Sequence, residues 1–63
     1  MRHLEDIYKT NDLHYHLWSV DNNWVIQAWS PLAKMYLPYQ RKEYSGPNAE
    51  TLARAAFQRI VES

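Results

Sequence analysis

The sequence predicts an α+β domain in which a small three-stranded antiparallel β-meander packs on one C-terminal α-helix. Two observations lead to this class. Residues 13–44 contain runs of alternating apolar and polar residues, which are typical of strands. Residues 45–63 carry apolar residues at the three- and four-residue spacing of an amphipathic helix. Because the chain has 63 residues, no repeat and no linker, we predict a single domain, residues 1–63.

The first ten residues are the least regular part of the chain. Leu4, Ile7 and Tyr8 have helical spacing, but the segment is short, uncapped and charged. We expect one or two helical turns here, with a loose end as the alternative. Glu5 and Asp6 stand where a signal peptide needs apolar residues, and no apolar run approaches the ~20 residues of a membrane span. Together with the absence of cysteine, this predicts a soluble cytoplasmic protein without membrane contact.

The first two alternating runs are predicted to form a hairpin around the Asp-Asn-Asn segment at residues 21–23. The two runs are residues 13–20 and residues 24–30. Asp and Asn tolerate the positive φ that tight turns require. A loop of two or four residues places Leu17 opposite Ile26 or Ala28, so that the apolar residues of both strands share one face. A three-residue loop would mix the faces, so we predict an even-numbered loop.

The third run, residues 34–44, is predicted to be a strand at the edge of the sheet. Pro38 lies within it, and proline cannot donate a hydrogen bond to a neighbouring strand. The helix can cover only one face of such a sheet. The side chains expected on the covered face are Leu13, Tyr15, Leu17, Trp24, Ile26, Ala28, Met35, Leu37 and Tyr39. Those expected on the opposite face are His14, His16, Trp18, Val25, Gln27, Trp29 and Tyr36.

The helix is the most clearly marked element. Ser45, Gly46, Pro47 and Asn48 are typical of a helix start, and Glu50 lies in the first turn, where the helix dipole favours negative charge. Its predicted apolar stripe comprises Leu52, Ala53, Ala56, Phe57 and Ile60. We expect Leu52, Phe57 and Ile60 to be the buried anchors, and we expect the alanines to allow a close approach to the sheet.

The uncovered face of the sheet is the candidate functional surface. Large aromatic side chains bury ~150–250 Å² each, so Trp18, Trp29 and Tyr36 together offer several hundred Å² of apolar area. This area equals or exceeds the ~300–600 Å² of the largest apolar patch on an ordinary monomer. Tryptophan and tyrosine are also enriched at binding hot spots. The residues predicted to bind a protein partner, either unidentified or a second copy, are Trp18, Trp29, Tyr36, His14, His16 and Gln27. The alternative is that the N-terminal segment folds over this face through Leu4, Ile7 and Tyr8.

No catalytic, metal or other cofactor chemistry is predicted. His14 and His16 lie on one side of a strand and could chelate a metal with His3 or Asp12, but the usual ligand clusters are missing. The serines stand in no nucleophile-elbow context, and there is no glycine-rich phosphate loop. We therefore expect a protein that is not an enzyme.

The alternative function is nucleic-acid binding through the sheet, since aromatic sheet faces stack on single-stranded bases. The candidate phosphate contacts are Lys34, Arg41, Lys42, Arg54 and Arg59. A formal net charge of zero argues against this alternative. The predicted topology is similar to integrase arm-binding and plant transcription-factor domains and to small phage-encoded inhibitors, without a shared motif. We expect a small protein-interaction module that binds through the aromatic sheet face or an exposed strand edge, such as a phage or mobile-element accessory or inhibitor protein.

Overall fold

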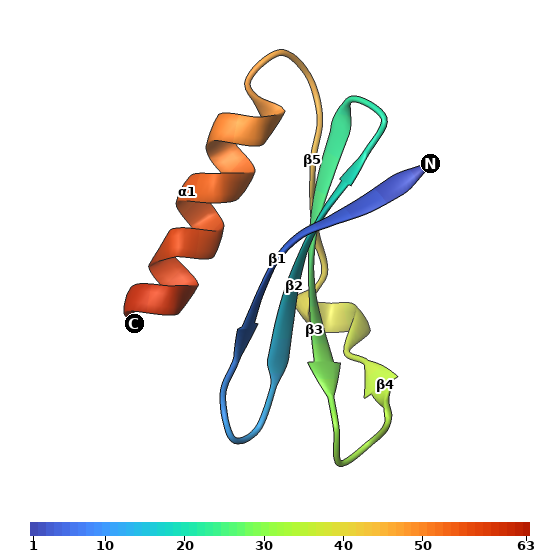
Figure 1. The fold of residues 1–63 in the computed structure, drawn as a ribbon, viewed down its shortest axis with the longest axis vertical. Helices are drawn as coiled ribbons and strands as arrows, with labels where there is room; N and C mark the ends of the chain where they lie inside the picture. Colours follow the sequence, from blue (N-terminus) through green and yellow to red (C-terminus); the bar gives the residue numbers. More distant parts are fainter.

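A computed structural model describes all of residues 1–63 and shows an antiparallel sheet packed against one C-terminal helix (Figure 1). The elements are β1 (Arg2–Lys9), β2 (His14–Val20), β3 (Asn23–Ser30), β4 (Met35–Tyr36), the 3₁₀ helix η1 (Pro38–Gln40), β5 (Lys42–Tyr44) and α1 (Ala49–Glu62). The strands β1, β2 and β3 are neighbours in chain order, and both β4 and β5 pair with β3. The predicted α+β class, an antiparallel sheet with one C-terminal helix, is therefore confirmed.

The β2–β3 hairpin has the register that the sequence predicts. Val20 pairs with Asn23 and Leu17 pairs with Ile26, which leaves a loop of two residues. Asp21, the first loop residue, has a φ of 54°, in the left-handed region that Asp and Asn tolerate better than most residues. The even-numbered loop keeps the apolar residues of both strands on the same face.

The N-terminal segment is a strand, so the expectation of helical turns is wrong. Residues Arg2–Lys9 form β1, which pairs antiparallel with β2 along its length. The register shifts between Leu4 and Asp6, where a β-bulge inserts an extra residue. Because of the bulge, Leu4 and Ile7 lie on one face of the strand although they are three positions apart. A spacing typical of a helix thus arises from a bulged strand.

The predicted third strand lies at the edge of the sheet but is interrupted. Pro38 starts the 3₁₀ helix that separates β4 from β5, and these short strands pair with opposite ends of β3. The interruption turns Tyr39 outward, so that its side chain is 79% exposed. Met35 is also exposed rather than buried. The expectation that Tyr39 and Met35 fill the core is therefore wrong.

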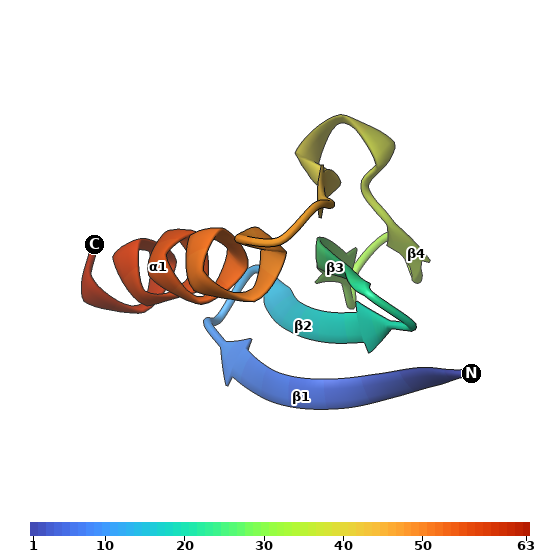
Figure 2. The ribbon, with the colours of Figure 1, turned by 90° about the horizontal axis from the view of Figure 1, so that it is seen from above.

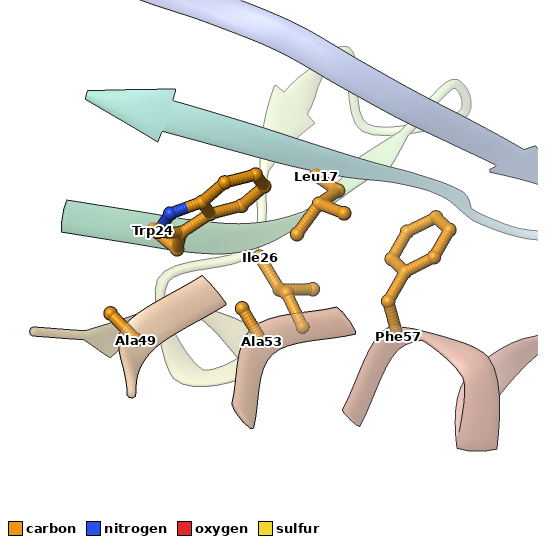
Figure 3. Close-up of a cluster of buried hydrophobic side chains, with 6 residues drawn as sticks. All are labelled: Leu17, Trp24, Ile26, Ala49, Ala53 and Phe57. Atoms are coloured by element: carbon orange, nitrogen blue, oxygen red, sulfur yellow. The ribbon is translucent and has the colours of Figure 1, made fainter. Parts of the chain in front are cut away.

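The core lies between the sheet and α1. Its buried side chains are Leu17, Trp24, Ile26, Ala49, Ala53 and Phe57 (Figure 3). Phe57 is 4% exposed, and Ile60 packs against the cluster at its margin. Leu52 is 52% exposed, so its predicted role as an anchor is wrong. Ala53 of the predicted stripe is buried in the cluster, and so is Ala49, which the predicted stripe does not include.

The helix covers one side of the sheet. Figure 2 shows α1 against one side, with the N-terminal end of β1 and β4 on the side away from it. The side chains of β2 alternate across the sheet. His16 and Trp18, which flank Leu17 in the sequence, therefore point away from α1. With 14 residues, α1 is also too short to cross a bilayer, and no other helix is long and apolar enough to do so.

Candidate functional site

Four ring side chains form a continuous row on the face of the sheet away from α1. We call Trp18, His16, Tyr36 and Trp29 the aromatic row. The ring centroids of Trp18 and His16 are 6.1 Å apart, those of His16 and Tyr36 are 5.6 Å apart, and those of Tyr36 and Trp29 are 5.1 Å apart. All three contacts are edge-to-face, the arrangement that aromatic quadrupoles favour. Rings from three strands therefore form a single surface.

The register of the sheet accounts for this row. Trp29 pairs directly with Tyr36, and His16 lies on the same face of the neighbouring strand. The 3.0 Å separation between His16 Nδ1 and the Tyr36 hydroxyl oxygen is a hydrogen bond whose donor depends on the imidazole tautomer. Burial, and then the positive charges of His14 and Lys9, hold the pKa of His16 below its usual value. The lowered pKa favours the neutral form of the imidazole.

One end of the row is formed by Trp18. The guanidinium carbon of Arg2 lies 4.3 Å from the centroid of the Trp18 ring, a cation–π contact between β1 and β2. The Trp18 indole Nε1 is buried without a hydrogen-bond acceptor. A buried donor without a partner costs about 1–3 kcal/mol.

Two apolar side chains of β1 extend the row toward the edge of the sheet. Leu4 pairs with Trp18 and is 44% exposed, and Ile7 pairs with His16 and is 41% exposed. The N-terminal segment thus lies beside the aromatic row rather than over it, contrary to the alternative in which it covers this face. Sequence reasoning missed Arg2 as a member of the surface and connected Leu4 and Ile7 with this face only in the alternative of a cover.

The residues predicted to bind a partner come together. His14 pairs with Trp29, and Gln27 pairs with His16, so both share the face of the aromatic row. All six predicted partner-binding residues are half-buried. The four rings of the aromatic row contact one another, and His14 and Gln27 lie on the same face beside them. We use "aromatic face" for the aromatic row together with Arg2, Leu4, Ile7, His14 and Gln27.

The cations predicted to contact phosphates are scattered. Arg54 of α1 pairs with Glu50 and Glu5, and its guanidinium carbon lies 4.9 Å from the Trp24 ring centroid on the helix side. Arg41 pairs with Glu43. Lys42 and Arg59 line a groove on the helix side of the sheet, and Lys34 lies in the β3–β4 turn. The structure does not bring these five cations together around the aromatic face.

The histidines do not converge on a common point. His3 pairs with Ser19, which places it on the opposite face from His16. Asp12 lies in the loop between β1 and β2. No group of three or more His, Cys, Asp or Glu side chains has metal-binding geometry.

Comparison of the chain with protein-family models, curated proteins and solved structures found no match. The functional argument therefore depends on the geometry of the aromatic face.

Proposed function

We propose that this protein is a non-enzymatic interaction module that binds another protein through the aromatic face. The observation that supports this most directly is the continuity of the surface. Ring contacts run from Trp18 to Trp29 across three strands, and the exposed Leu4 and Ile7 continue the surface on β1. Apolar surfaces of this kind on a small monomer are typical of binding sites. The cytoplasmic location and a role as a phage or mobile-element accessory or inhibitor remain predictions from the sequence.

Charge favours a different protein over a second copy as the partner. Arg2 and Lys9 lie on this face, opposite Val20 and His14 respectively. The only carboxylate on the same face, Glu43, is paired with Arg41. Two such faces brought together would place cations against cations, which opposes association. We therefore propose an apolar partner surface that carries carboxylates at its margin.

Nucleic acid is the less favoured occupant. The rings of the aromatic row meet edge-to-face, so their flat sides are partly used within the row. The five candidate phosphate-binding cations lie elsewhere or are paired with carboxylates, as described above. A nucleic-acid surface would combine stacking rings with a path of several free cations, whereas this face carries two, Arg2 and Lys9.

The test uses exposed residues of the aromatic face, so that the fold is retained. Leu4→Ser with Ile7→Ser removes apolar surface from the binding side, whereas Leu52→Ser removes a similarly exposed side chain from α1. Tagged wild-type protein and both variants are used in quantitative pull-downs, and circular dichroism verifies their folding. We expect one or more partners to be retained by wild type and the Leu52 variant but depleted by about tenfold or more with the double variant.

Three outcomes would contradict the proposal. Equal capture by all three proteins would show that the aromatic face is not the contact surface. Tight binding of a single-stranded oligonucleotide at pH 8 and about 150 mM salt would reverse the order of the two functions. Sedimentation of the purified protein as a dimer that the Leu4/Ile7 double variant abolishes would identify a second copy as the occupant.

A further inference from the structure

A second surface, independent of the aromatic face, lies between α1 and the interrupted strand. It is a groove of about 450 Å³, within the range of about 300–1,000 Å³ that is typical of small-molecule sites. The walls are mainly apolar. The apolar members are Tyr15, Ile26, Tyr39, Ala56 and Ile60, which come from β2, β3, η1 and α1.

The interruption of the strand at Pro38 leaves the groove open. A regular strand through residues 34–44 would have turned Tyr39 toward the core. Pro38 instead starts η1, which leaves Tyr39 exposed at the margin of the groove. The buried Ile26 and the half-buried Ile60 therefore line an open apolar site.

Two cations give this groove a charge preference. Lys42 of β5 and Arg59 of α1 both line it, and neither makes an ion pair. No carboxylate is among the lining residues. This differs from the other arginines of the same region, since Arg41 and Arg54 are both paired with glutamates. An arginine and a lysine that are free at the margin of an apolar groove suit a carboxylate headgroup, with charge-assisted hydrogen bonds to its oxygens.

We propose that this groove binds a small amphipathic carboxylate, with the carboxylate between Lys42 and Arg59 and the apolar body against Ile26 and Ile60. The proposal does not depend on the proposed function, because the groove and the aromatic face lie on opposite sides of the sheet. It assigns a ligand class, a monocarboxylic acid with an aliphatic or aromatic body, to a site that has room for such a molecule.

The test is a titration of ¹⁵N-labelled protein with three probes, followed by two-dimensional NMR. Octanoate has both the charge and the chain, octanol has the chain alone, and acetate has the charge alone. We expect octanoate to shift the amide signals of Tyr15, Ala56 and Ile60 and to bind at least about tenfold more tightly than either of the other probes. Equal binding of octanol, or shifts centred on Trp18 and Trp29, would overturn the proposal.

Variants assign the charge to particular side chains. Lys42→Gln with Arg59→Gln alters two exposed residues, and Lys34→Gln is the matched control because Lys34 is an exposed lysine outside the groove. We expect the double variant to lose about tenfold or more of the octanoate affinity while octanol binding stays unchanged. An unchanged octanoate affinity in the double variant would refute the assignment of these two cations.

Discussion

Phe57 and Leu52 provide the sharpest test of the fold, because the sequence pattern predicts both to be anchors and the structure buries only one. Phe57 is 4% exposed, and its ring lies against the sheet near Leu17 (Figure 3). Leu52 is 52% exposed on the same helix. Replacing each residue by alanine therefore removes a large apolar side chain, from a buried position at Phe57 and from an exposed position at Leu52.

The two substitutions should differ several-fold in their effect on the free energy of unfolding. Removing a buried phenylalanine side chain costs about 3–5 kcal/mol. At about 0.05–0.15 kcal/mol per residue, the whole chain has roughly 3–9 kcal/mol to lose. Phe57→Ala should therefore leave the protein largely unfolded or barely stable at 25 °C. Leu52→Ala should cost under about 1 kcal/mol, because the side chain is half in water already and alanine favours the helix.

Urea titration followed by far-ultraviolet circular dichroism measures both effects. We expect a small displacement of the midpoint for Leu52→Ala and little or no folded baseline for Phe57→Ala. A thermal midpoint for Phe57→Ala within about 2 °C of wild type would refute the docking of α1, since 1 kcal/mol corresponds to about 4–8 °C in a domain of this size. A Leu52→Ala variant as unstable as Phe57→Ala would show that the helix is rotated about its axis.

Three further predictions concern single features. Because the pKa of His16 is lowered in the folded protein, neutral His16 contributes stability that is present above about pH 6.5 and is lost as pH falls through the folded pKa. Thermal melts between about pH 7.5 and 5.5 should show this loss of stability, and His16→Gln should make the loss smaller. Asp21→Val should cost about 1–2 kcal/mol relative to Asp21→Gly, because a β-branched residue is strained at a φ of 54°; equal unfolding midpoints would contradict this. Zinc should not raise the melting temperature, whereas a ligand at 100 times its Kd would add about 2.7 kcal/mol; a rise abolished by His16→Ala would establish a metal site.

The β2–β3 hairpin and its two faces were predictable because strand alternation and loop parity constrain each other. The position of Leu17 opposite Ile26 follows from the requirement that both apolar sets face the helix. Once this register is set, Trp18 and Trp29 must lie on the other face. The six predicted partner-binding residues come together for this reason, whereas their role in binding remains a prediction.

Two features were not predictable because a local irregularity changed the periodicity, and a third because the residue lies at the margin of a helical stripe. The bulge in β1 gives Leu4 and Ile7 a helical spacing, which concealed a strand and, with it, the contact of Arg2 with Trp18. The 3₁₀ helix at Pro38 reversed the side on which Tyr39 lies. Leu52 was at the margin of the predicted helical stripe, where a small rotation decides burial. A proline inside an alternating run was the one sequence feature that indicated an interruption.

The length of α1 explains why it covers only one face of the sheet. A helix of 14 residues is about 21 Å long and can lie against one side only. The aromatic face lowers the cost of exposure by its own internal contacts, since His16 and Tyr36 satisfy each other by a hydrogen bond and the rings pack edge-to-face. It does not remove that cost, since Leu4 and Ile7 remain exposed and the Trp18 indole nitrogen has no acceptor. The aromatic face is ordered without a partner but still exposes apolar side chains and contains an unpaired indole N–H. Such a face suits reversible binding, because association needs little rearrangement and still buries apolar surface.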